Sequence, residues 1–158
     1  MDTLWAPWRM TYIEKAQPSG CLFCEAPCTG NDEKDLLVYR GKSVFILMNL
    51  YPYNPGHLMI APYRHIDDLG KLSRDEQAEL IQETARSTTL LSEAMNPDGF
   101  NVGMNQGKVA GAGIEDHLHM HVVPRWNGDT NFMPIVGATR VIPEHLAATY
   151  QRLASLFR

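Results

Sequence analysis

The stretch that decides the fold is His117-Leu118-His119-Met120-His121-Val122-Val123-Pro124, in which three histidines alternate with apolar residues. Side chains of a β-strand point alternately to opposite faces. The pattern therefore predicts a strand with three imidazoles on one face, spaced about 6.5–7 Å apart, and with Leu118, Met120 and Val122 on the other. We expect the apolar face to pack into the core and to hold the histidine face rigidly.

Three of the six histidines of the chain share this predicted face. A single histidine is usually structural or solvated, but packing alone does not require three on one side of a strand. One alternative is a catalytic zinc site, because His-x-His pairs on strands often bind metals. Such a site needs carboxylates or further histidines to complete its shell, and the chain after Val123 offers Asp129 but no histidine before His145.

The rest of the chain predicts the neighbours of this strand. Two β-rich runs flank Gly41-Lys42, which is typical of a hairpin, and the turn residues Asn54-Pro55-Gly56 precede another apolar run. We expect strands at residues 36–40, 43–49, 57–61, 100–104 and 116–123. Ser73 and Glu76 form a capping box that starts a long helix, since apolar residues then recur near the 3.6-residue period.

This long helix is expected to end at Asn96-Pro97-Asp98-Gly99. Pro143 suits the first position of a final helix, which carries apolar side chains near one face. Together the elements predict an α+β fold, with a mostly antiparallel sheet of about five strands, one long helix and a C-terminal helix.

Length and composition favour a single globular domain that spans residues 1–158. No apolar run approaches the roughly 18 residues that cross a bilayer, and the first twenty residues lack the apolar stretch of a secretory signal, so a cytoplasmic protein is expected. The net charge of −4 does not indicate duplex DNA or an anionic membrane as a partner, and neither is expected. It does not exclude a small phosphate ligand, which needs only a local set of donors.

Three cysteines, Cys21, Cys24 and Cys28, lie in an N-terminal arm at residues 1–35. An odd count without an export signal argues against a disulfide framework and for a metal site or free thiols. The pair Cys21-Leu22-Phe23-Cys24 has the spacing of one half of a zinc knuckle, although redox chemistry uses the same spacing. Cys28 is expected to be a spare thiol.

The histidine stretch resembles the signature of the histidine triad (HIT) superfamily of nucleotide hydrolases and transferases. The resemblance continues elsewhere, at Asn49, residues 54–62, Asn105-Gln106-Gly107, residues 124–134 and the opening residues 4–9. Within this superfamily, the chain is similar to the bacterial branch described as diadenosine tetraphosphate phosphorylases or Fhit-like hydrolases. The resemblance implies a HIT-like fold and an enzyme that cleaves dinucleoside polyphosphates at the α-phosphate.

Carried over to this chain, the resemblance makes His119 the nucleophile, which would form a covalent nucleotidyl-histidine. A neutral imidazole is available at pH 7 because its ordinary pKa is about 6.5. His121 would bind the phosphate or the leaving oxygen, and His57 would orient His121. The intermediate would then pass to water in a hydrolase or to orthophosphate in a phosphorylase.

The resemblance also implies substrate contacts. Asn49 would meet the ribose, or alternatively serve as a turn residue at a strand end. Asn105 and the backbone N–H groups of Gly111, Ala112 and Gly113 would stabilise the phosphoryl oxygens. Many family members place Ser or Thr where this chain has Ile114, which puts the phosphate contacts of this loop in doubt.

For the cysteine pair, the resemblance supplies His65 and His117 as partners. A closed set of Cys21, Cys24, His65 and His117 predicts a structural zinc site, because four protein ligands leave no position for a reacting water. The alternative is a reduced cysteine pair in a metal-free protein.

Two other functions stay open: a hydrolase of nucleoside phosphoramidates or adenylylated lysine, and a nucleotide-binding regulator with little turnover. DNA-end deadenylation is disfavoured because such branches usually carry basic or zinc-finger extensions. The family resemblance also implies a two-fold homodimer. Trp5 and Trp8 would suit its interface, or would equally cover the domain's own core.

Overall fold

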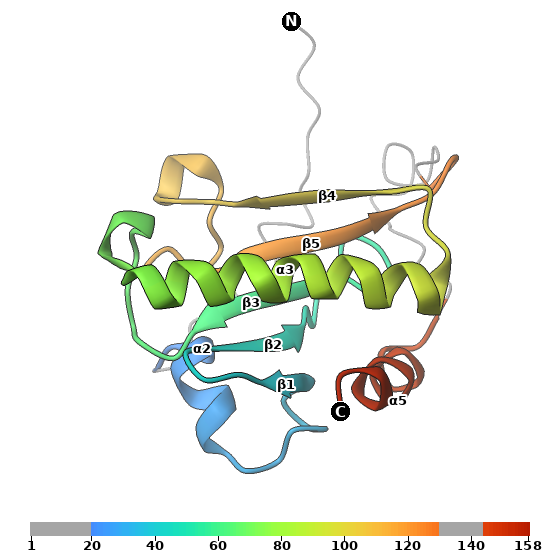
Figure 1. Ribbon diagram of the computed structural model, residues 1–158, viewed down its shortest axis with the longest axis horizontal. Helices are drawn as coiled ribbons and strands as arrows, with labels where there is room; N and C mark the ends of the chain where they lie inside the picture. The colour runs from blue at the N-terminus through green and yellow to red at the C-terminus, as the bar shows by residue number, and fades with distance from the viewer. Residues whose placement is uncertain (1–19, 130–143) are drawn as a thin grey trace, which may run out of the picture.

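The computed structural model describes residues 20–129 and 144–158, and these form two helices packed on one face of a five-stranded sheet (Figure 1). The sheet order is β1-β2-β3-β5-β4, and every neighbouring pair is antiparallel. Its strands are β1 (Leu37–Arg40), β2 (Val44–Met48), β3 (Leu58–Pro62), β4 (Gly99–Met104) and β5 (Met120–Arg125). The α+β class and the antiparallel sheet expected from the sequence are confirmed.

The helices are α2 (Leu22–Glu25), α3 (Arg74–Met95) and α5 (Leu146–Leu156), with 3-10 turns η1 (Ala26–Cys28), η2 (Leu69–Lys71) and η3 (Lys108–Ala110). The capping box at the start of α3 is present, with Ser73 accepting from the Glu76 backbone N–H. The helix ends at Met95, because its C-cap Asn96 has a left-handed conformation (φ 47°) that stops it. No helix within the described ranges is long and apolar enough to span a membrane.

The final helix begins at Leu146, with His145 as its N-cap, and the predicted first position, Pro143, lies outside the described residues. The apolar face expected of it is present, because Tyr150, Leu153 and Phe157 are buried in the core beneath α3.

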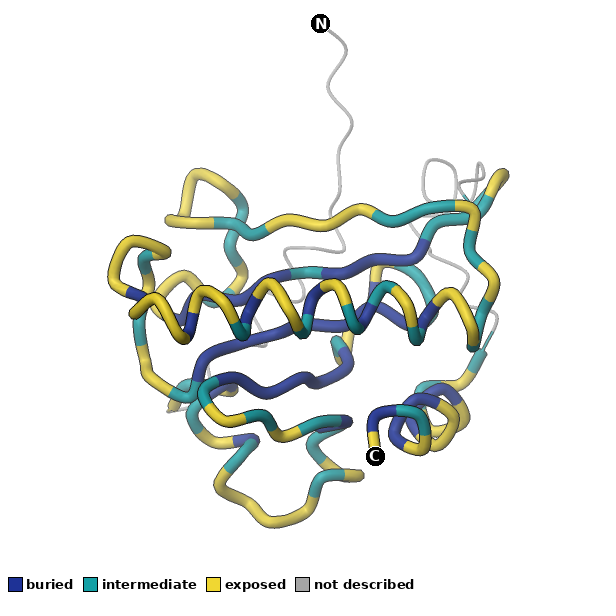
Figure 2. The backbone as a smooth tube through the Cα atoms, in the orientation of Figure 1, coloured by how far each residue is buried: buried dark blue, intermediate teal, exposed yellow. Residues whose placement is uncertain are grey.

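The central strands β2 and β3 are buried along their whole length (Figure 2), and their apolar side chains divide between two clusters, one on each face of the sheet. On the helix side, Ile46, Ile60 and Val122 join one large core cluster. On the opposite side, Phe45 and Leu47 belong to a smaller cluster, which is defined by Phe23, Leu37, Phe45, Leu47, Met59 and Ala61. In the edge strand β4, three residues are exposed and three are half-buried.

The histidine strand was predicted from residue 116, and this boundary is wrong because β5 begins at Met120. A strand ladder requires a partner, and pairing with β3 starts only where Ile60 meets Met120. Before that point, the Leu118 N–H donates to the Ile66 carbonyl at 2.6 Å instead. The alternation is nevertheless kept, since Leu118, Met120 and Val122 all lie in the helix-side core.

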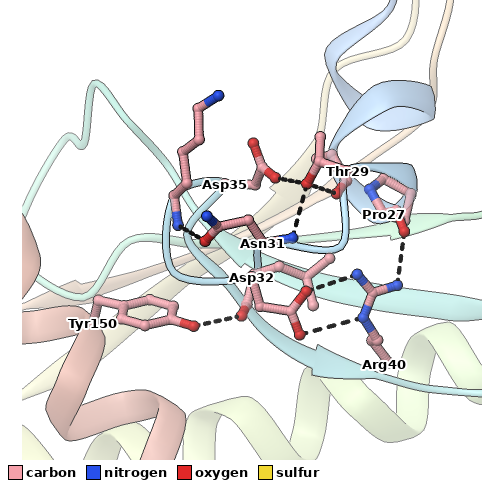
Figure 3. Close-up of polar contacts among 10 residues, drawn as sticks. Pro27, Thr29, Asn31, Asp32, Asp35, Arg40 and Tyr150 are labelled. Carbon is pink, nitrogen blue, oxygen red and sulfur yellow. Dashed lines mark hydrogen bonds and ion pairs between the residues drawn. The ribbon is translucent and has the colours of Figure 1, made fainter.

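The loop from η1 to β1 ties the cysteine segment to the sheet (Figure 3). Arg40 of β1 donates to the Pro27 carbonyl at 2.9 Å and pairs with Asp32 at 2.7 Å. The hydroxyl of Tyr150 on α5 donates to the Leu37 carbonyl at 3.2 Å. These contacts fasten the segment that follows the cysteines to β1.

Candidate functional site

Four histidines gather on the sheet face opposite the long helix. His117, His119 and His121 come from the β5 segment, and His57 precedes β3, the neighbouring strand. The His119 and His121 rings lie 4.7 Å apart between centroids, and the His57 and His121 rings lie 5.1 Å apart. The structure therefore brings together the three side chains predicted to be catalytic.

His119 is held in one tautomer by the backbone. Its Nδ1 lies 2.8 Å from the carbonyl oxygen of His117, and because a carbonyl only accepts, Nδ1 carries the hydrogen. The neutral ring then keeps a lone pair on Nε2. Burial lowers the pKa of His119, with the ring only 4 % exposed, so the neutral form is favoured.

Phe23 is the main packing partner of this ring. Its own ring lies 4.6 Å from His119 and 5.2 Å from His117, and it is fully buried. Phe23 sits on α2 between the two knuckle cysteines. The nucleophile predicted for this site is therefore packed against the cysteine segment.

His57 and His121 form a directly hydrogen-bonded pair, with His57 Nε2 and His121 Nδ1 2.9 Å apart. The other ring nitrogen of His57, Nδ1, faces the backbone N–H of Tyr53 at 3.1 Å. The Tyr53 ring also packs on His57, with centroids 4.7 Å apart. His57 is buried between β3 and this turn, so it can orient His121 as expected.

Asn49, predicted to meet the ribose, lies against His57. Its Nδ2 is 3.4 Å from His57 Nδ1, and its Oδ1 accepts from the Tyr51 backbone N–H at 2.9 Å. It is thus part of the histidine network and also a turn residue after β2.

Asn105 directly follows β4, whose register pairs Gly103 with His121 and Met104 with Met120. Extended by one position beyond the ladder, this register would place Asn105 opposite His119. The Asn105 amide donates to the Gly111 carbonyl at 3.5 Å, which closes the loop that leads to Gly111, Ala112 and Gly113. Gly111 has φ 86°, a conformation that favours glycine.

Ile114 packs against the smaller apolar cluster that contains Phe23. The side chain at this position therefore serves packing. This position therefore offers no hydroxyl to a phosphate, unlike the Ser or Thr of many family members.

A second cluster joins the cysteine pair to the same strand segment. One ligand atom each from Cys21, Cys24, His65 and His117 lies within 4.8 Å of the others. Cys21 Sγ is 3.3 Å from His117 Nδ1, and Cys24 Sγ is 3.3 Å from His65 Nδ1. Tetrahedral zinc with its usual bond lengths gives sulfur–nitrogen edges of about 3.6 Å, so the spacing fits.

The tautomer of His117 also fits a metal ligand. Its Nε2 lies 2.9 Å from the Pro62 carbonyl and so carries the hydrogen. Nδ1 then directs its lone pair towards the sulfurs, an arrangement common for ligating histidines. Burial and the nearby Cys21 raise the pKa of Cys24 to about 11, an unfavourable setting for a thiolate that a divalent cation would reverse. Cys28 is exposed and outside the cluster.

Comparison with known proteins identifies the family to which the chain belongs. The family model of the HIT domain matches residues 31–128. The chain belongs to the HIT family. It is 44% identical to an AP-4-A phosphorylase of Mycobacterium tuberculosis over 163 residues, covering 98% of this chain and 84% of that protein. It is 35% identical over 81 residues to a bis(5'-adenosyl)-triphosphatase of Dictyostelium discoideum, covering 51% of this chain and 54% of that protein.

A solved HIT structure is similar over most of the fold. The Zn-bound histidine triad family protein from Mycobacterium smegmatis superposes with a TM-score of 0.69 at 25% identity, covering 88% of this chain and 94% of that one. In this chain, Cys21, Cys24, His65 and His117 form a group that could hold a metal ion.

Two contributors to the HIT site were missed in the sequence. In the sequence, Phe23 was considered only as a residue between the two cysteines. A large apolar residue at that position indicates a side chain that packs between the cysteine segment and the sheet. The backbone N–H of Tyr53 left no signal, because every residue except proline has one.

Proposed function

We propose that this HIT protein cleaves dinucleoside polyphosphates, such as diadenosine tetraphosphate, at the α-phosphate through a covalent nucleotidyl-His119 intermediate. The observation that carries this proposal is the tautomer of His119. Its Nδ1–H bonds the His117 carbonyl, so the lone pair of Nε2 is available to attack phosphorus. The names of the similar proteins, a phosphorylase and a triphosphatase, support the substrate class.

In the first step, Nε2 of His119 forms a bond to the α-phosphorus, and the electron pair of the breaking P–O bond leaves with the polyphosphate. The attacking ring gains positive charge, which the hydrogen bond from Nδ1 to the His117 carbonyl stabilises. In the second step, the acceptor attacks the same phosphorus and His119 departs as a neutral ring.

The negative charge on the phosphoryl oxygens requires donors that are already in place. His121 supplies one, oriented by His57. Asn105 and the backbone N–H groups of residues 111–113 are the others that we propose. Each such donor typically contributes about 2.7–4 kcal/mol to lowering the barrier in other enzymes.

The acceptor is tested by the products formed from diadenosine tetraphosphate. Attack at an α-phosphate releases ATP in either case, and the bound AMP then leaves as AMP with water or as ADP with orthophosphate. The name of the Mycobacterium tuberculosis relative favours orthophosphate. Anion-exchange chromatography of reactions with and without orthophosphate is expected to show ADP only when it is added. Formation of neither AMP nor ADP would overturn the proposal.

The nucleophile is tested by His119→Asn. We expect binding of the dinucleotide to persist while turnover falls by about 10⁴–10⁶-fold, the range seen when a nucleophile or its partner is removed elsewhere. His145→Asn is the matched control, because His145 caps α5 and asparagine is a good N-cap. Retained activity in His119→Asn, or failure to trap labelled nucleotide on the wild-type protein, would contradict a covalent role for His119.

The metal that we propose for the cluster is zinc, held by Cys21, Cys24, His65 and His117. With four protein ligands it would clamp the cysteine segment to the sheet and take no part in the reaction. Elemental analysis of the purified protein is expected to give one zinc per chain.

A phosphoramidate or adenylyl-lysine hydrolase is the alternative function, and a panel of such substrates beside dinucleotides would reveal it. We also propose one HIT domain over residues 1–158, a cytoplasmic location, no nucleic-acid partner and a homodimer. β4, in which Val102 is 47 % exposed, is one of the two edge strands of the described sheet, and we propose that the partner protomer contacts it. Trp5 and Trp8, the residues expected to suit the dimer interface, lie outside the described residues. Light scattering after size-exclusion chromatography tests whether the protein is a dimer.

A further inference from the structure

The ladder between β3 and β5 stops one residue short of His57. Its last pair joins Leu58 to Val122, and Pro124 lies two positions further along β5. The Pro124 carbonyl points to the β3 side, so its nitrogen, which points the same way, would be the next donor of the ladder. Proline has no N–H to donate. His57 therefore lies beyond the backbone ladder, whereas His121 lies within it.

The side chain of Asn54 takes the place of the missing ladder bond. Its amide nitrogen donates to the Pro124 carbonyl at 2.9 Å and to the Asp129 carboxylate at 2.7 Å. Both oxygens only accept, so they fix the orientation of the amide, and its two hydrogens serve both contacts. The backbone carbonyl of Asn54 accepts from the N–H of His57 at 3.2 Å. Asn54 thus connects the end of β5 directly to His57.

Asp129 is itself held by residues at the end of β5. Arg125 donates to its two carboxylate oxygens at 2.6 and 2.8 Å, and the Trp126 N–H donates at 3.1 Å. The Asp129 side chain is only 11 % exposed. Because these donors belong to β5 and the turn that follows it, the contact between Asp129 and Asn54 fixes the turn before β3 relative to β5.

We propose that Asn54 and Asp129 are positioning residues that keep His57 at hydrogen-bonding distance from His121. His57 Nε2 and His121 Nδ1 lie 2.9 Å apart, and a displacement of about 1 Å would break such a bond. The Asn49 N–H donates to the His57 carbonyl at 2.9 Å and ties His57 to β2, while Asn54 and Asp129 tie it to β5. This inference rests on the proposed function, in which His121 contacts the phosphate or the leaving oxygen.

The kinetic test is Asn54→Ala, which removes both donated hydrogen bonds and keeps every histidine. Its kcat on diadenosine tetraphosphate should fall by about 10–100-fold, the range for losing an outer contact or displacing a reacting group slightly. KM should change little, because the Asn54 amide is directed to Pro124 and Asp129.

Asn101→Ala is the matched control. Asn101 accepts from Arg125 at 2.6 Å in the same network, but it lies on β4, on the other side of β5 from the turn. This variant should keep the wild-type kcat. Equal losses of kcat in both variants, or wild-type kcat in Asn54→Ala, would contradict the proposal.

Nitrogen NMR of the 17.8 kDa protein labelled at histidine tests the position of His57 without any turnover. In wild-type protein, the hydrogen shared by His57 and His121 should give a coupling across the bond. The coupling should disappear in Asn54→Ala and persist in Asn101→Ala. An unchanged coupling in Asn54→Ala would overturn the proposal. If wild-type protein shows the coupling but cleaves no dinucleotide, the proposed function fails by itself.

Asn54→Asp separates hydrogen bonding from the filling of space. The substitution keeps the shape of the side chain, but at pH 7 it turns a carboxylate towards the carboxylate of Asp129, and like charges repel. Its kcat should fall at least as far as in Asn54→Ala. If circular dichroism shows that the charged variant does not fold, Asn54→Leu, neutral and of similar size without a donor, gives the same comparison. Wild-type kcat in the folded variant would show that space filling suffices and would refute the assignment.

Discussion

Neutralising Glu76 is expected to destabilise the protein in a pH-dependent way. The Glu76 carboxylate accepts from Arg64 through both Nε and Nη2, each at 2.7 Å, and from the Ser73 backbone N–H at 2.7 Å. Arg64 also donates to the Lys71 carbonyl at 2.9 Å. These contacts join the start of α3 to the segment that carries His65, one of the proposed metal ligands.

The expected magnitude follows from the carboxyl group. The hydrogen bonds from Arg64 lower the pKa of Glu76 from 4.5 to about 2. At about 1.36 kcal/mol per unit, the full shift corresponds to about 3.4 kcal/mol. The Arg64 side chain is 56 % exposed, and solvent screening reduces the contribution of such a pair to about 1 kcal/mol or less.

The sign is set by the lowered pKa. Because the folded state keeps Glu76 ionised, its contribution is complete above the unfolded pKa near 4.5 and disappears as the pH falls towards 2. The free energies of urea unfolding of wild-type protein and Glu76→Gln should differ by about 1 kcal/mol at pH 7 and by much less at pH 2.5. Glu93→Gln, on an exposed position of the same helix, is the matched control. An equal difference at both pH values would refute the reasoning.

Three further changes test other contacts. Phe23→Leu should lower turnover more than it changes KM, because the ring packs on His119, and should cost about 1–2 kcal/mol of stability; kinetics and urea unfolding measure both. Cys24→Ser should lose bound zinc while Cys28→Ser keeps it, as elemental analysis will show, and equal zinc in both would exclude the proposed ligand set. Tyr150→Phe should lower the free energy of unfolding by about 1 kcal/mol, because a β1 carbonyl loses its donor.

Local features of the fold could be predicted from the sequence because their causes are local. The capping box spans only the residues from Ser73 to Glu76, and both of its hydrogen bonds are present. The alternation of His119 with Leu118 and Met120 follows from backbone geometry, and it persists even outside the strand ladder. Both depend on neighbours a few positions away.

The boundary of β5 failed for the opposite reason. A strand begins where its partner strand is within reach, and the partner in β3 is about 60 positions away in the chain. The hydrogen bond of Leu118 with Ile66 replaces the ladder, and no pattern within residues 116–123 indicates this. Strand content is a local property, but strand ends are set by tertiary contacts.

The site divides in the same way. Histidines on one face are visible in the sequence, whereas the ligand set of the cysteines was supplied by family resemblance, since His65 and His117 lie far along the chain. Asn49 shows a third situation. Its proximity to the site was expected, but its contact with His57 depends on how the turn at Tyr51 orients its amide.

The proposed metal cluster and the proposed nucleophile meet at one residue, His117. Its side chain directs Nδ1 towards Cys21, while its carbonyl oxygen accepts the hydrogen that fixes the tautomer of His119. Phe23, between the cysteines, packs on both rings. A disturbance of the cysteine segment therefore reaches His119 by two routes, through the carbonyl and through the Phe23 ring. Because both routes end at the proposed nucleophile, loss of the cluster should lower the rate of attack on phosphorus more than it weakens substrate binding.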